Sequence, residues 1–198
     1  MNAAGRGGGF RVRPYRSGDR GDVLKICADT GFLGNPVDPI FQDRDLFNDF
    51  LTSPYTDAEP ECCFVLENAK GEIEGYLTAS KDGAKHTGFI RSQLPQWFAR
   101  ACYGFLFRYN PASRRYLLWL MFRGWRQTPK RPRDAAHFHV NLLPQVRSVE
   151  AVRTLIDSFL ECMTRYGIRC VYGQVVTRGE RRGERTFARY GFRITDKR

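Results

Sequence analysis

The last third of the chain contains two apolar segments with an amphipathic segment between them, and this order constrains the fold most. Residues 136–143 have the pattern of a strand that stops at Pro144, and residues 168–176 have that of a second strand. Between them, residues 149–165 carry apolar side chains at helical spacing. Since such crossovers join parallel strands of one sheet, the segment predicts a βαβ unit in which the two strands are neighbours.

A basic turn, Gln145 to Ser148, joins the first of these strands to the helix. The first turn of a helix has unpaired backbone N–H groups and carries a partial positive charge. The turn therefore predicts a binding site for a phosphorylated ligand.

The front of the chain has the patterns of further strands and helices. Together with the last third it predicts a single α/β (α+β) domain that spans residues 10–198, after a Gly-rich leader at residues 1–9. Each predicted element has a recognisable start or stop signal. The predicted elements are a strand at 10–13 ended by Pro14, a helix capped by Ser17 or Asp19, a helix from Asp43 or Asp45 to Pro54–Tyr55, and a hairpin of strands 62–67 and 72–80.

Several short motifs resemble those of the Gcn5-related N-acetyltransferase (GNAT) family. They are Arg13-Pro14-Tyr15-Arg16 with Asp19, residues 63–67 followed by Gly75-Tyr76-Leu77, and the closing Phe187-x-x-x-Gly191-Phe192. The front half is most similar to the acetyltransferase-like C-terminal domain of O-GlcNAcase and its bacterial relatives. The resemblance implies a GNAT-like acyl-CoA N-acyltransferase fold, with a mixed, mostly antiparallel sheet of six or seven strands and helices on both faces.

The same resemblance implies an acetyl-CoA-dependent N-acetyltransferase in which a primary amine attacks the thioester directly. The amine would belong to a small molecule or to a protein lysine, and acetyl-CoA would be the cosubstrate. The residues that the resemblance assigns to acetyl-CoA are Leu142, Leu143, Gln145, Val146, Arg147, Ser148, Val149, Glu150, Ala151 and Val152.

Two departures from the family pattern keep an alternative open. The pyrophosphate loop normally has small residues where this chain has Glu150 and Val152, and glycine there lets the backbone approach phosphate closely. Phe187 stands where many members have a tyrosine that protonates the thiolate. The alternative is a catalytically inactive pseudo-acetyltransferase that acts as a binding module.

Histidine and tyrosine are the candidate acid–base residues. Strand alternation places His137, His139, Asn141 and Leu143 on one face. His139 is the first choice as general base and His137 the second, because imidazole titrates near neutral pH; a structural role for both remains the alternative. Tyr190 is a candidate general acid, and the backbone N–H of Leu143 a candidate donor to the thioester oxygen.

Residues 81–134 form an insert where the family needs only a short loop. Their aromatic and apolar content predicts a helical hairpin at 89–126 that covers the groove between the fourth and fifth strands. The apolar run at 116–122 is too short to span a bilayer, although its flanking arginines leave an interfacial membrane helix as the alternative.

Composition limits the remaining possibilities. The formal charge of +11 predicts a field that attracts anions, with the arginines spread through the chain, and it disfavours a polyamine acceptor unless an acidic pocket exists. No nucleic-acid-binding signature is present, so nucleic acid is an unlikely partner. The six cysteines form no Cys-x-x-Cys pair, which argues against a metal site, and the absence of a signal sequence predicts a cytoplasmic protein.

Overall fold

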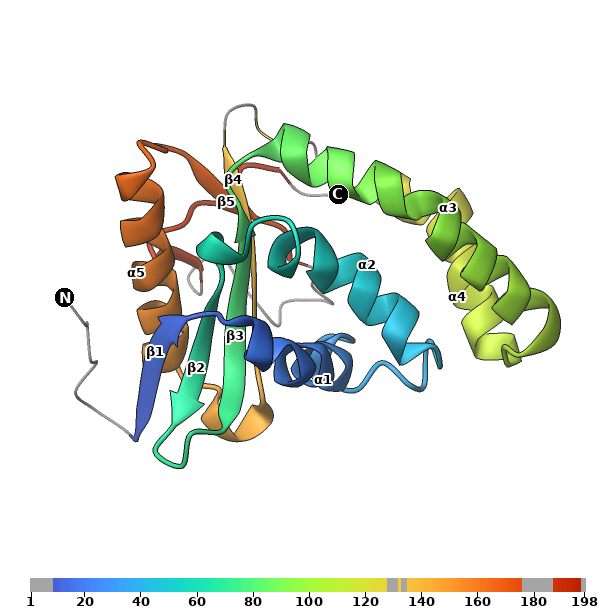
Figure 1. Cartoon of the computed structure of the whole chain (residues 1–198), viewed down its shortest axis with the longest axis horizontal. Helices are drawn as coiled ribbons and strands as arrows, with labels where there is room; N and C mark the ends of the chain where they lie inside the picture. The colour runs from blue at the N-terminus through green and yellow to red at the C-terminus, as the bar shows by residue number, and fades with distance from the viewer. Residues whose placement is uncertain (1–8, 128–131, 133–134, 176–186, 197–198) are drawn as a thin grey trace.

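The computed structural model describes residues 9–127, 132, 135–175 and 187–196, and its centre is one five-stranded sheet in the order β1-β2-β3-β4-β5 (Figure 1). The strands are β1 Phe10–Pro14, β2 Phe64–Asn68, β3 Ile73–Ser80, β4 Ala136–Leu142 and β5 Val171–Gly173. Pairing is antiparallel from β1 to β4 and parallel between β4 and β5. The mixed, mostly antiparallel sheet is confirmed, with five strands in the described residues where six or seven were predicted.

Helices cover both faces of the sheet, as predicted. α1 (Arg20–Thr30) and α2 (Arg44–Thr56) lie on one face, and α5 (Val149–Arg165) lies on the other (Figure 1). Strand alternation divides the core in two: Leu66, Leu77 and Phe138 face α5, whereas Val65 and Tyr76 face α1 and α2.

The predicted βαβ unit is present. β4 and β5 are parallel neighbours, with Ala136 aligned to Val171 and Phe138 to Gly173, and α5 connects them. The helix begins where the Ser148 hydroxyl accepts the Ala151 N–H at 3.1 Å, a standard N-cap. Its buried face includes Ala151, Leu155 and Phe159, all with no exposed surface.

Several boundaries differ from the sequence prediction, and the second strand of the βαβ unit, predicted at 168–176, is the shorter β5, Val171–Gly173. α2 begins as predicted, with Asp43 accepting the Leu46 N–H at 3.0 Å, but it continues through Pro54 to Thr56. Proline in the last turn removes one hydrogen bond without ending the helix, because buried Tyr55 holds that turn against the sheet. Cys62 lies in a short 3₁₀ turn (Pro60–Cys62) instead of a strand.

The insert forms the predicted helical hairpin, but the predicted position over the β4–β5 groove is wrong. α3 (Gly83–Phe107) and α4 (Pro111–Phe122) project away from the sheet beside α2 (Figure 1). The hairpin is anchored by buried Trp97 and Tyr109, and the Tyr109 hydroxyl donates to Asp43 at 2.5 Å. Gly104 permits this contact, since a Cβ there would lie 2.1 Å from the Tyr109 ring.

We expect Arg13→Met to lower the free energy of unfolding by about 2–3 kcal/mol at pH 7. Arg13 donates to Asp19 at 2.7 and 2.8 Å and also to Glu67, and these bonds lower the pKa of both carboxyl groups. A lowered folded-state pKa means that the stabilisation is present at neutral pH and is lost as the pH falls through the folded value. The deficit should therefore shrink in acid.

Urea unfolding across pH measures this effect. The matched control is Arg11→Met, which removes a mostly exposed partner of the same Glu67 and should cost less than about 1 kcal/mol. A deficit for Arg13→Met that stays constant down to acid pH would contradict the assignment.

Candidate active site

In the part of the chain that the structure describes, the sheet opens on the β5 side of β4 immediately before His139. Within it, β5 pairs with β4 from Ala136 to Phe138, and the remainder of β4, His139 to Leu142, extends past its parallel neighbour. An opening between parallel strands gives a ligand access to backbone groups in the middle of the sheet. The candidate site is built around this point.

All three histidines of the chain meet there. The ring centroids of His137 and His139 lie 4.6 Å apart, and those of His137 and His86 lie 6.3 Å apart. His86 and His137 are buried, whereas His139 is partly exposed. His139 is therefore the most exposed histidine of the three.

Two tyrosines that sequence analysis missed complete the cluster. The Tyr55 hydroxyl and His137 Nδ1 are 2.8 Å apart, and the Tyr55 ring lies 5.6 Å from that of His139. Tyr172 on β5 stacks on His137 at 4.7 Å. Since Tyr55 and Tyr172 hold His137 from both sides, His137 is placed to orient His139.

A pocket of about 620 Å³ adjoins the cluster at the N-terminal end of β4. It lies where the end of β3 and the start of α3 meet the segment after α5. The polar side chains that line it are Ser80, Lys81, Asp82, His86, Thr87, His137, Tyr166 and Tyr172. The phosphate turn predicted from sequence lies at the opposite, C-terminal end of β4, so His139 stands between the two.

Thr78 adds a further polar group on the same face. It is aligned opposite His139 in the β3–β4 register and is 1% exposed. Its hydroxyl has no hydrogen-bond partner within the described residues. A buried hydroxyl without a partner is costly, so it favours a site that a polar ligand completes.

The turn after β4 offers fewer free backbone N–H groups than the sequence suggests. Val146 donates to Leu143, Arg147 to Pro144, and Ala151 to the Ser148 hydroxyl. Among the described residues, the N–H groups of Gln145, Ser148, Val149 and Glu150 remain without a partner in the chain. The last three lie at the start of a 17-residue helix, where the helix dipole favours an anion.

The side chains that sequence analysis assigned to the cofactor fall into two groups. Leu142, Val146, Ala151 and Val152 pack on the core between α5 and the sheet, so mainly their backbone is available. The others lie at or near the surface of the turn; they are Leu143, Gln145, Arg147, Ser148, Val149 and Glu150.

Arg147 is fixed by main-chain carbonyls. Its guanidinium donates to the Leu142 carbonyl at 3.1 Å and to the Gly34 carbonyl at 3.0 Å. Because carbonyl partners leave its charge uncompensated, Arg147 contributes positive potential at the end of β4. Glu150, exposed at the second helical position, opposes that potential.

Two expected catalytic groups are not brought into the site. The Tyr190 ring packs on the apolar cluster under α5, on the opposite face from the histidines. The Leu143 N–H is already bonded to the Glu74 carbonyl at 2.9 Å. Alternation along β4 instead directs the Val140 N–H away from β3, as Ala136 does when it donates to Cys170 of the β5 side.

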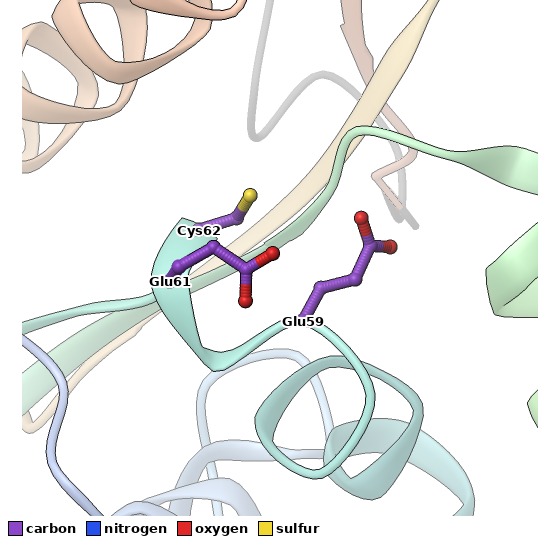
Figure 2. Close-up of side chains that lie close together, drawn as sticks. All are labelled: Glu59, Glu61 and Cys62. Carbon is purple, nitrogen blue, oxygen red and sulfur yellow. The ribbon is translucent and has the colours of Figure 1, made fainter.

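The turn between α2 and β2 carries Glu59, Glu61 and Cys62 close together (Figure 2). The Lys81 ammonium lies 3.8 Å from Glu59 and also pairs with Glu61. Fully buried Glu59 accepts the Ser80 hydroxyl at 2.5 Å. Lys81 therefore supplies the positive charge of this cluster, which fixes the end of β3 beside the pocket.

Comparisons with solved structures place the fold among acetyltransferases. No protein-family model matches the sequence. The protein SsHAT is 29% identical, with a TM-score of 0.66 over 83% of this chain and 81% of that one. A polyamine N-acetyltransferase of Drosophila melanogaster is 14% identical, with a TM-score of 0.55 over 94% and 84% of the two chains.

A third structure is yncA, a putative acetyltransferase from Salmonella typhimurium solved with its cofactor acetyl-CoA. It is 14% identical, with a TM-score of 0.52 over 95% of this chain and 82% of that one. The chain therefore has the fold of these acetyltransferases, which confirms the predicted GNAT-like fold class. The finer resemblance to O-GlcNAcase stays a prediction.

Proposed function

We propose that this protein is an acetyl-CoA-dependent N-acetyltransferase. The observation that carries the proposal is the meeting of His86, His137 and His139 where β4 leaves β5. The group lies between an anion-binding turn at one end of β4 and a pocket at the other. This order suits a reaction in which a phosphorylated cosubstrate and an acceptor approach from opposite sides.

Acetyl-CoA fits the turn and the opening beside β4. Its pyrophosphate would accept the N–H groups of Ser148, Val149 and Glu150, and Arg147 adds positive potential. From Leu143 to His139 the strand spans about 13 Å at 3.3 Å per residue, a distance for the extended pantetheine arm to cover. The Val140 N–H is then placed to donate to the thioester oxygen.

Transfer needs one new bond and one broken bond. The acceptor nitrogen attacks the thioester carbonyl, a C–N bond forms, and the C–S bond breaks. His139 takes the proton of the attacking amine, and the leaving thiolate takes a proton from water. Preorganised donors and a base in hydrogen-bond reach supply most of the rate enhancement in such reactions.

The acceptor is a primary amine that enters through the pocket. The pocket lining contains one carboxylate, Asp82, and one ammonium, Lys81. Asp82 is already engaged with the N–H groups of Ala84 and Lys85, which lower the pKa of its carboxyl group. Because the pocket lining has one carboxylate for one ammonium group, it favours an acceptor of low net charge over a polycation.

We expect Glu150→Gln to tighten acetyl-CoA binding about three- to tenfold. The substitution removes a negative charge beside the three N–H groups and keeps the size of the side chain. The matched control is Glu161→Gln, an exposed change far along the same helix, which should leave the affinity unchanged. Calorimetry measures both, and equal affinities for Glu150→Gln and wild type would place the pyrophosphate elsewhere.

Product detection separates an enzyme from an inactive binding module. Thermal shift with acetyl-CoA, CoA and duplex DNA first reports which ligand binds, because a ligand of the native state raises the melting temperature. Mass spectrometry of an amine library incubated with acetyl-CoA then detects N-acetylated product. Saturable binding of CoA without product from any amine would support the pseudo-acetyltransferase alternative.

A further inference from the structure

The helical hairpin exposes most of the large apolar side chains that the described part of the chain leaves in solvent. Ten of the fifteen lie on α3 and α4; they are Leu94, Phe98, Tyr103, Leu106, Phe107, Leu118, Trp119, Leu120, Met121 and Phe122. Phe107 is 71% exposed, and Phe98 and Phe122 are each 64% exposed. Apolar groups gathered in this way mark an interaction surface.

The same segment accounts for the net charge of the protein. Residues 83–133 contain eleven Lys and Arg and no Asp or Glu, whereas the rest of the chain contains 21 residues of each sign. A second positive segment lies at the end of the chain, where residues 165–198 contain ten Lys and Arg against three Asp and Glu, but the insert is the segment that lacks carboxylates altogether. Its charge pattern is therefore distinct from that of the sheet domain.

Several of these cations lie beside the exposed apolar side chains. Arg91, Arg108, Arg115 and Arg123 are exposed, and none of them forms an ion pair with a carboxylate of the described residues. The exposed surface of the hairpin thus combines aromatic and aliphatic side chains with unneutralised guanidinium groups. The buried anchors Trp97 and Tyr109 hold the hairpin on the body of the protein.

We propose that the α3–α4 hairpin docks the protein on an anionic lipid bilayer. Aromatic and aliphatic side chains enter the headgroup boundary, and arginines attract anionic lipids, which is the combination that interfacial helices use. The hairpin lies along the surface, since none of the helices in the described residues is long and apolar enough to cross a bilayer.

Charge and composition favour a bilayer over two other occupants. A second copy would bring two strongly cationic hairpins together, and like charges across an interface are repulsive. Nucleic acid would satisfy the arginines, but protein–DNA interfaces are more polar than a surface of Leu, Met and Phe. An anionic bilayer can bury the apolar side chains and pair with the arginines.

Vesicle cosedimentation of the full chain tests the proposal. We expect binding to phosphatidylcholine vesicles with about 30% phosphatidylglycerol, weaker binding without it, and weaker binding at high salt. Phe107→Ser with Phe122→Ser should lower the partition coefficient about tenfold or more, as should Arg115→Glu with Arg123→Glu. The controls are Val175→Ser and Lys70→Glu, exposed changes outside the hairpin that should bind like wild type.

Tryptophan fluorescence provides an independent measurement of vesicle binding, because all three tryptophans, Trp97, Trp119 and Trp125, lie in the insert. Their emission should shift to shorter wavelength on anionic vesicles. Failure of the wild type to bind such vesicles at low salt would overturn the proposal, and so would binding that the hairpin variants do not change. A wild-type dimer that Phe107→Ser with Phe122→Ser converts to monomer, or binding to duplex DNA alone, would assign the surface to another occupant.

Discussion

Replacement of His139 by glutamine is expected to lower kcat for amine acetylation about 10²- to 10⁴-fold, the usual contribution of a positioned general base. His139 is the partly exposed member of the histidine cluster and stands at the opening beside β5. Acetyl-CoA affinity should change little, because the phosphate turn lies at the other end of β4. Steady-state kinetics and calorimetry measure the two quantities.

The pH dependence supplies the control for this variant. The wild-type rate should fall in acid as the base is protonated, and His139→Gln should lack that limb of the profile. His137→Gln should have a smaller effect, since His137 acts by orienting its neighbour through Tyr55 and Tyr172. A rate for His139→Gln within a few-fold of wild type, with the acid limb intact, would remove His139 from the mechanism.

Phe159→Ala is expected to lower the free energy of unfolding by about 3–5 kcal/mol. Phe159 has no exposed surface and contacts Phe138 of β4 at a ring distance of 5.0 Å, so truncation leaves a cavity between α5 and the sheet. The same packing fixes the helix whose first turn we propose as the pyrophosphate site. Urea unfolding measures the loss.

Val149→Ala is the matched control on the same helix. Val149 is 45% exposed at the first helical position, and its truncation should change stability by less than about 0.5 kcal/mol. Equal effects of the two substitutions would mean that α5 does not form the core described here.

Elements with a regular period could be predicted from the sequence. The apolar spacing of residues 149–165 gave α5 within its observed bounds, and alternation placed His137 and His139 on one face. Asp43, one of the two predicted starts, is the N-cap of α2. Local spacing is sufficient to predict a feature that a single helix or strand determines.

The rest of the site depends on contacts between distant parts of the chain. Tyr55 lies 82 residues before His137, and the proline beside it suggested that α2 ends there. His86 belongs to an insert whose path the sequence does not specify. The Leu143 N–H was assigned to the thioester because strand spacing alone does not say which groups β3 already pairs.

The position of the insert was wrong for a different reason. Its apolar content was interpreted as a need for burial against the sheet, yet Phe98, Phe107 and Phe122 remain exposed. A partner outside the chain can provide the same burial, and sequence patterning does not distinguish the two cases.

A crystal structure with bound acetyl-CoA tests the central claim most directly. We predict pyrophosphate oxygens within hydrogen-bond distance of the Ser148, Val149 and Glu150 N–H groups, the arm beside β4, and the thioester carbon next to His139. Acetyl-CoA bound away from this opening, or no bound acetyl-CoA at saturating concentration, would contradict the account.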